Sequence, residues 1–294
     1  MKTEYIDGTE IEIVNPNTQR GSIRYAIFDN DGTISVLREG WEQVMEPVMI
    51  KSILGERFHD IDDATYNRVK KAVQVYIDES TGIQTILQME HLVEMVKDFG
   101  FVPDDKIRDK HGYKSLYNEE LMRVVNERLR KISTGELSPT DFLVKGAREI
   151  LEELNRRRVK MYLASGTDRE DVVNETGVLG VDTFFKSIYG SVGDVAKYSK
   201  KIIVDKLIEE NSLSGPELAV FGDGPVEIRE VKRVGGIAVG VASDEVRRFG
   251  VNSAKRERLI RAGADIIIGD FTQMKKLMSY LFEPVQQALH TNGE

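Results

Sequence analysis

Two carboxylates that are two residues apart, Asp29 and Asp31, follow the short apolar run Tyr25–Phe28. An apolar run of this length is typical of a strand that is buried on both faces. Gly32 lets the backbone turn at once, so both acids are expected at the carboxyl end of the strand, where open α/β sheets bind ligands. The alternative is a turn with solvated acids, which the buried strand in front of it argues against.

A second pair of carboxylates, Asp223 and Glu227, follows the apolar run Leu218–Phe221. The two oxygen ligands are four residues apart at another strand end, and Mg²⁺ usually takes one or two hard carboxylates together with waters and a phosphate oxygen. The sequence therefore predicts a magnesium site here. The alternative is a helix N-terminus at which acidic side chains stabilise the helix dipole.

Small and hydroxylated residues, Ser165-Gly166-Thr167-Asp168, follow a third apolar run, Met161–Ala164. A helical pattern begins directly afterwards, with Asp168 as its expected N-cap. A hydroxyl group and free backbone N–H groups at such a helix start can hold an anion. A purely structural junction between strand and helix remains the alternative.

Three lysines, Lys197, Lys200 and Lys201, lie near the start of a further helical pattern. Lysines at a helix start are unfavourable for the helix dipole, and a bound anion would explain them; a solvated basic turn would also. Lys200 is in register with the apolar positions three, four and seven residues further on. We therefore predict that Lys200 holds an anion, with Lys197 as the rival.

Five apolar runs and the helical patterns between them indicate a doubly wound α/β fold with a parallel sheet. The runs are Tyr25–Phe28, Met161–Ala164, Leu218–Phe221, Ile237–Val241 and Ala264–Ile268. More than one hundred residues with helical periodicity separate the first run from the second, too many for a loop in a compact fold. We therefore expect an inserted all-helical cap domain at residues 36–141 and a core formed by residues 21–35 and 142–282.

The two ends of the chain are expected to lie outside this core. Residues 1–20 are expected to form an N-terminal extension, with a weak sequence signal for a hairpin around Asp7-Gly8. Residues 283–294 are expected to form a flexible tail.

Composition and charge exclude several classes of function. The chain has 294 residues, 40% of them hydrophobic, a net charge of −8 and no cysteine, so disulfides, thiolate nucleophiles and cysteine zinc sites are excluded. The acidic balance argues against nucleic acid as a partner. No apolar segment is long enough for a membrane span or has the form of a signal peptide, so a cytoplasmic location is expected. The four histidines lack metal-ligand spacing.

Taken together, the four motifs resemble those of the haloacid dehalogenase superfamily in order and spacing. The resemblance covers about Arg24–Thr33 and Phe142–Asp270, which is the core but not the cap. It implies a central parallel sheet with the Asp29 strand in the middle. Two departures are Asn30 between the two aspartates and a lysine without the common K-P-x-P context.

The resemblance also implies roles for individual residues and a small-molecule phosphate ester as substrate. Asp29 would be the nucleophile and Asp31 the acid and base, with catalytic assistance from Ser165 and Lys200. The phosphoryl group would be bound by Thr33, Ser165, Gly166 and Lys200. The metal, Mg²⁺, would be bound by Asp29, Asp31, Asp223 and Glu227.

These roles make chemical sense together. Magnesium and a lysine would offset the repulsion between the carboxylates and a phosphate dianion. An acid such as Asp31 is needed for an oxygen leaving group but not for halide, which favours a phosphatase over a dehalogenase. The alternatives are a phosphomutase, a phosphonatase, for which no cap lysine has a recognisable context, and a binding or regulatory module on an inactive core.

The cap is expected to select the substrate. Gln84 and Gln88 are four residues apart on one helical face and would suit a hydroxylated leaving group, unless they form an ordinary exposed face. Arg38 and Trp41 lie close to the hinge, where Arg38 would touch the substrate or anchor the cap and Trp41 would pack in the core.

Overall fold

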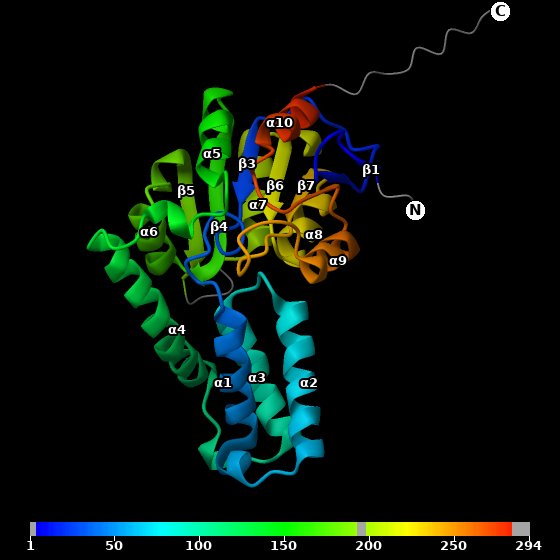
Figure 1. Ribbon diagram of the computed structural model, residues 1–294. Helices are drawn as coiled ribbons and strands as arrows, with labels where there is room; N and C mark the ends of the chain where they lie inside the picture. Colours follow the sequence, from blue (N-terminus) through cyan, green and yellow to red (C-terminus); the bar gives the residue numbers. More distant parts are fainter. Residues whose placement is uncertain (1–3, 193–197, 284–294) are drawn as a thin grey trace, which may run out of the picture.

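The protein has an α/β core and a bundle of helices that extends from one end of it (Figure 1). The computed structural model describes residues 4–192 and 198–283. An eight-stranded sheet has the order β1-β2-β8-β7-β6-β3-β4-β5. All neighbours from β8 to β5 pair in parallel, whereas β1 pairs antiparallel with β2, and β2 with β8. The expected doubly wound fold with the Asp29 strand in the middle is therefore confirmed.

The strands of the sheet are short, as their apolar runs predict. They are β1 (Glu4–Tyr5), β2 (Glu12–Ile13), β3 (Tyr25–Phe28), β4 (Lys160–Asp168), β5 (Phe185–Ser191), β6 (Leu218–Gly222), β7 (Ile237–Val241) and β8 (Ile266–Ile268).

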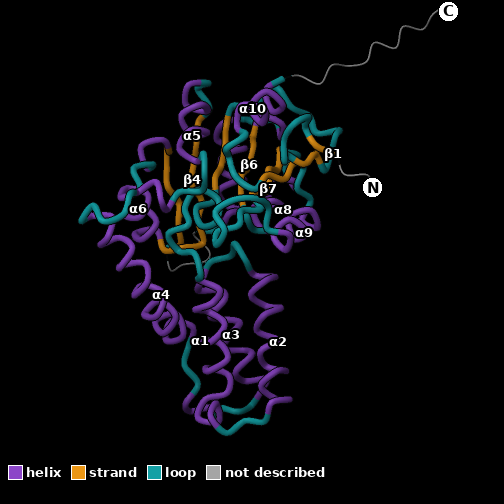
Figure 2. Tube along the Cα trace, in the orientation of Figure 1, coloured by secondary structure: helices purple, strands orange, loops and turns teal. Residues whose placement is uncertain are grey.

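Helices cover both faces of this sheet; in Figure 2 they are purple and the strands are orange. The core helices are α5 (Ala147–Arg156), α6 (Arg169–Val178), α7 (Lys200–Asn211), α8 (Pro225–Arg233), α9 (Ser253–Ala262) and α10 (Met274–Phe282). Successive residues of a strand point to opposite faces. Thus Phe28 packs in the cluster that includes residues of α5 and α10, while Ile27 packs with residues of α7, α8 and α9.

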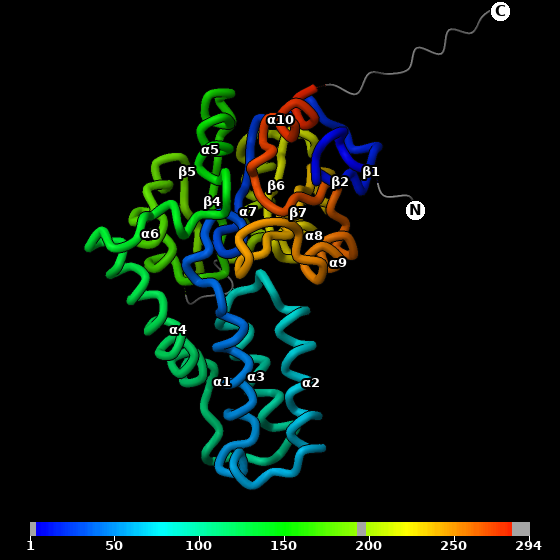
Figure 3. Tube along the Cα trace, in the orientation of Figure 1, coloured from blue at the N-terminus to red at the C-terminus, as the bar shows by residue number. Residues whose placement is uncertain are grey.

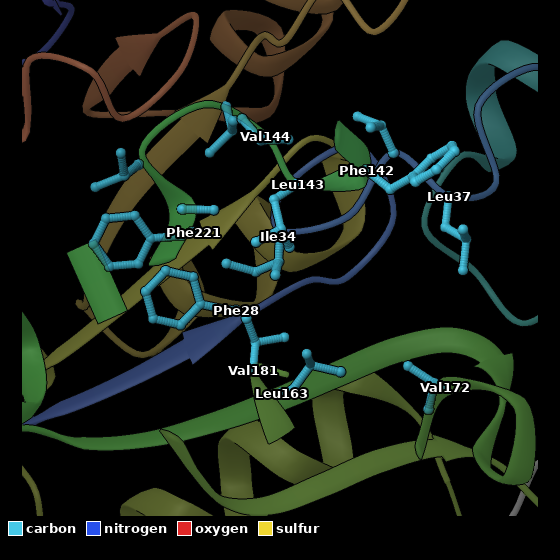
Figure 4. Close-up of a cluster of buried hydrophobic side chains, with 14 of the residues drawn as sticks. Phe28, Ile34, Leu37, Phe142, Leu143, Val144, Leu163, Val172, Val181 and Phe221 are labelled. Carbon is cyan, nitrogen blue, oxygen red and sulfur yellow. The ribbon is translucent and has the colours of Figure 1, made fainter. Parts of the chain in front are cut away.

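The face beside α5 and α10 holds the larger of two hydrophobic clusters, part of which is drawn in Figure 4. The rings of Phe28 and Phe221, on neighbouring strands, stack with their centroids 4.5 Å apart. Ile34 and Leu37, which follow the Asp29 loop, are fully buried and join the same cluster. This packing fixes the loop that carries the first two carboxylates against the end of the sheet.

The cap is formed by helices α1 (Trp41–Leu54), α2 (Asp63–Ser80), α3 (Thr85–Phe99) and α4 (Lys110–Ser133). The continuous colour of the trace shows that the chain leaves the core after β3 and returns to it through α4, which reaches α6 (Figure 3). Buried apolar residues at helical spacing on these four helices form the interior of the bundle. Among the described residues, no helix has the length and hydropathy needed to cross a bilayer.

Three features differ from the sequence expectations. Strand β5, at the edge of the sheet, was not predicted, because its residues are only partly buried and lack an apolar run. Strand β4 continues through Ser165 to Asp168 with an irregular register, rather than ending at Ala164. The N-terminal hairpin is not separate from the core, since β2 extends the sheet beside β8. The expected tail lies, except for Glu283, outside the described residues.

Candidate active site

A buried lysine joins two of the predicted motifs. The Lys200 Nζ donates hydrogen bonds to Asp29 Oδ1 at 2.8 Å and to Glu227 Oε2 at 2.9 Å. Lys200 begins α7, Asp29 follows β3 and Glu227 lies in the first turn of α8. All three side chains are buried. Because β3 and β6 are parallel neighbours, their carboxyl ends bring the acids together at one edge of the sheet.

Burial and charge set the protonation of this pair. Burial alone would lower the pKa of Lys200, but Asp29 and Glu227 outweigh this effect and raise it, so the ammonium stays charged. Burial raises the pKa of Asp29, and the nearby Lys200 opposes part of that rise. The lysine therefore favours the ionised form of Asp29.

Three carboxylates lie close enough to hold one metal ion. Asp29, Asp223 and Glu227 each offer an oxygen, and these oxygens lie within 4.8 Å of one another. This all-oxygen donor set fits Mg²⁺. Glu227 also accepts hydrogen bonds at both its oxygens, from the Gly224 N–H at 2.7 Å and from Lys200. Asp31 is not part of this group, and its place among the metal ligands stays a prediction.

The Asp31 carboxylate instead faces the end of β4. Its Oδ2 accepts hydrogen bonds from Thr167 Oγ1 at 3.0 Å and from Ser165 Oγ at 3.4 Å. Burial raises the pKa of Asp31, whereas Arg38 and the hydrogen bond from Thr167 lower it. A carboxyl group with a raised pKa is suited to donate a proton.

A second lysine, which the sequence reasoning did not identify, contacts the other end of the carboxylate group. Lys255 Nζ, from the first turn of α9, lies 2.7 Å from Asp223 Oδ2 and 2.5 Å from Glu245 Oε1. The backbone turn at Gly32 passes directly against this pair, because a Cβ atom at Gly32 would overlap Asp223. Gly32 has a φ of 72°, a conformation that favours glycine.

A small cavity of about 70 Å³ lies between these groups and the cap. On the core side its walls include the carboxylates Asp29, Asp31 and Asp223 and the hydroxylated end of β4. On the cap side they include Trp41, Thr81, Gly82, Ile83, Thr85, Gln88, Tyr117 and Leu121. The cap loop enters deeply, since a Cβ atom at Gly82 would lie 2.9 Å from Glu227 Oε2. Trp41 thus contributes to the cavity as well as packing against the apolar core.

The two cap glutamines have different environments. Both are buried, so the alternative that they form an ordinary exposed helix face is wrong. Gln84 uses both ends of its amide on the core: Nε2 donates to the Tyr198 carbonyl at 2.6 Å, and Oε1 accepts from Ser191 Oγ at 2.8 Å. Gln88 donates to Ser80 Oγ within the cap and lines the cavity. Only Gln88 is therefore placed to contact a substrate.

Arg38 lines the cavity but is held by the core. Its Nη2 lies 2.5 Å from Glu175 Oε1 and 3.1 Å from Asp171 Oδ2, both on α6. A second contact anchors the cap nearby, because Lys114 of α4 lies 2.5 Å from Asp168 Oδ1. Asp168 occupies the N-cap position of α6, as expected, but its carboxylate contacts Lys114 and makes no capping hydrogen bond.

The remaining predicted site residues differ in whether they line the cavity. Ser165 and Gly166 line the cavity. Thr33 does not line it: the residue is fully buried, its hydroxyl has no hydrogen-bond partner among the described residues, and its role in phosphate binding stays a prediction. Lys201 is exposed and lies 3.5 Å from Asp205. Lys197, the rival to Lys200, lies outside the described residues.

Thr167, Tyr198 and Lys255 are the site residues that sequence reasoning missed. Thr167 stands in the hydroxylated run after β4, and its alternation with Ser165 on an extended strand could have revealed it. The Tyr198 hydroxyl donates to the Ser165 carbonyl at 2.5 Å. No local pattern marks Lys255, because its partners come from other elements.

Comparisons with known proteins agree with this geometry. A family model described as haloacid dehalogenase-like hydrolase matches residues 23–235. A search of curated proteins found no significant match. Similar solved structures include a β-phosphoglucomutase from Clostridium difficile, with TM-score 0.57, 16% identity and coverage of 89% of this chain and 100% of that chain. A predicted phosphoglycolate phosphatase from Haemophilus somnus 129PT has TM-score 0.56, 15% identity and coverage of 87% and 98%.

At these identities the structural likenesses show the fold, whereas the family model matches the sequence itself over most of the chain. Its matched region contains the acid pair after β3, the hydroxylated end of β4, Lys200 and the carboxylates after β6. The chain belongs to the haloacid dehalogenase-like hydrolases.

Proposed function

We propose that this protein is a magnesium-dependent phosphatase that hydrolyses a small phosphate monoester through covalent phosphorylation of Asp29. The observation that carries the proposal is the contact between Lys200 and Asp29, with Asp31 close by. A carboxylate nucleophile, a fixed cation beside it and a carboxyl group with a raised pKa are the groups that this reaction needs.

In the first step, an oxygen of Asp29 attacks phosphorus and the bond to the leaving oxygen breaks. Asp31 gives its proton to that oxygen, so the alcohol leaves neutral. In the second step, Asp31 takes a proton from water, the water oxygen attacks phosphorus, and the bond to Asp29 breaks. Phosphate leaves, and both aspartates return to their starting states.

Positive charge around the phosphoryl group comes from the chain and from the metal. The Lys200 ammonium offsets the charge of Asp29 and of the incoming phosphate. Asp29 and Asp223, with Glu227, would hold Mg²⁺, which when bound supplies charge that stabilises the phosphoryl oxygens. The hydroxyl of Ser165 and the backbone at Gly166 line the same cavity and are placed to bind phosphoryl oxygens.

The cavity supports a small substrate. A volume of about 70 Å³ is well below the ~300–1,000 Å³ that is usual for small-molecule pockets. The cap also closes on the core through Gln84 and through the ion pair of Lys114 with Asp168. We infer that the cap opens to admit substrate and then excludes water from the reacting groups.

A phosphatase screen tests the proposal. Purified protein is incubated with sugar phosphates, nucleotides, phospho-acids and an aryl phosphate, and released phosphate is measured with Mg²⁺ and with EDTA. We expect release from at least one small monoester with Mg²⁺ and none with EDTA. Isomerised sugar phosphate without released phosphate would indicate a phosphomutase instead, and full activity in EDTA would contradict the metal site. Asp223→Asn should raise the Mg²⁺ concentration required.

A further inference from the structure

The environment of Lys255 has the form of a cation position. Three oxygens surround its ammonium: Asp223 Oδ2 at 2.7 Å, Glu245 Oε1 at 2.5 Å and Ser243 Oγ at 3.4 Å. Only 12% of the lysine side chain is exposed. A lysine in the first turn of a helix opposes the helix dipole, and a buried ammonium needs such compensation. These oxygens therefore stabilise the Lys255 ammonium at a helix start, where the helix dipole disfavours a positive charge.

This position shares a ligand with the proposed magnesium site. Asp223 belongs to the carboxylate group with Asp29 and Glu227 and also accepts a hydrogen bond from Lys255. Ser243 in turn donates to the carbonyl of Gly32, which ties the position to the loop that follows Asp29. A carboxylate that bridges two cation positions a few ångströms apart is the arrangement found in two-metal phosphoryl-transfer sites.

We propose that the Lys255 ammonium permanently occupies a second cation position, and that it thereby limits the active site to one divalent ion. The inference rests on the proposed function, because it takes the group that includes Asp223 as the metal site. The ammonium excludes a second ion by filling the space between Asp223 and Glu245 and by repelling other cations. It also weakens the affinity of the first ion, because a fixed positive charge touches one of that ion's ligands.

Calorimetric titration with Mn²⁺, in the absence of substrate, tests the proposal without relying on activity. We expect wild-type protein to bind one ion. Lys255→Ala, which leaves room among the three oxygens, should bind two. The double variant Lys255→Ala with Glu245→Gln should return to one, because the second position loses a charged ligand. Lys201→Ala, which removes an exposed lysine of α7, is the matched control and should behave as the wild type.

Lys255→Met provides a second test, which does not require the substitution to leave space for a second ion. The apolar side chain keeps the space filled but removes the charge, so one ion should still bind, with a dissociation constant lowered about tenfold. A structural role alone would lower the melting temperature without changing stoichiometry or affinity.

Two results would overturn the inference. One is a single ion bound by Lys255→Ala at millimolar Mn²⁺, and the other is an unchanged dissociation constant for Lys255→Met. The proposed metal site is judged separately by Asp223→Asn: wild-type protein that binds no ion, or that binds it as well after this substitution, would overturn the metal site and this inference with it. Wild-type binding that depends on Asp223 leaves the proposed function intact whatever Lys255 does.

Discussion

Lys200 and Asp29 are 171 residues apart in the chain and form a buried ion pair with a distance of 2.8 Å. The pair joins the start of α7 to the end of β3, at the edge of the sheet that faces the cap. Because Lys200 also contacts Glu227, it connects the proposed nucleophile to the carboxylates that follow β6.

Replacing Lys200 by alanine should reduce phosphatase activity by about 10²–10³-fold, because a fixed charge at the reacting phosphoryl group is lost. It should also lower the free energy of unfolding by about 3–5 kcal/mol, since two buried carboxylates lose their partner. Steady-state kinetics and urea unfolding measure the two effects. Lys201→Ala, one residue away but exposed, is the control and should change neither. A Lys200→Ala enzyme with most of its activity would refute the assignment.

Asp29→Asn should reduce turnover by a factor on the order of 10⁴, because the amide keeps the shape of the side chain but is not a nucleophile. Circular dichroism should show an unchanged fold. Asp98→Asn, an exposed position in α3, is the control. Trapping of phosphorylated protein by rapid acid quench should succeed in the wild type and fail in the variant; turnover near the wild-type rate would show that another group attacks phosphorus.

Asp31→Asn should affect substrates according to their leaving groups. An alkyl phosphate needs a proton on its leaving oxygen, whereas a nitrophenyl phosphate does not. We expect kcat/KM for the alkyl ester to fall about 10²-fold more than that for the aryl ester, because kcat/KM reports formation of the covalent intermediate. Equal losses on both esters would mean that Asp31 does not protonate the leaving group.

The two cap glutamines should differ when each is changed to alanine. Gln84→Ala removes two contacts between cap and core, so kcat/KM should fall by a similar factor for every substrate. Gln88 lines the cavity, so Gln88→Ala should reduce activity on the best natural substrate more than on a small aryl phosphate. The ratio of the two kcat/KM values in each variant is the measurement. A changed ratio for Gln84→Ala, or an unchanged one for Gln88→Ala, would reverse the assigned roles.

The sequence by itself determined the core fold and most of the residues at the site. Buried strands have continuous apolar runs, and the carboxyl ends of parallel strands meet at one edge of the sheet. Polar residues that follow such runs, among them Asp29, Ser165 and Asp223, can therefore be placed together without knowledge of the packing. The sequence also favoured Lys200 over the neighbouring lysines as the anion-binding residue, because Lys200 is in register with the apolar stripe of α7, which reflects the local helical period.

Only the tertiary structure decided how side chains from different elements pair. Thr33 follows the two acids in sequence, yet the turn at Gly32 directs it into the interior. Gln84 and Gln88 share a helical period, yet the docking of the cap assigns one to the core and the other to the cavity. Lys255 reaches Asp223 because α9 packs against β7, the neighbour of the strand that precedes Asp223. Such contacts depend on how helices and strands pack against one another. The hydrophobic period of a single helix or strand shows which of its faces is buried, but not which residues of other elements that face will contact.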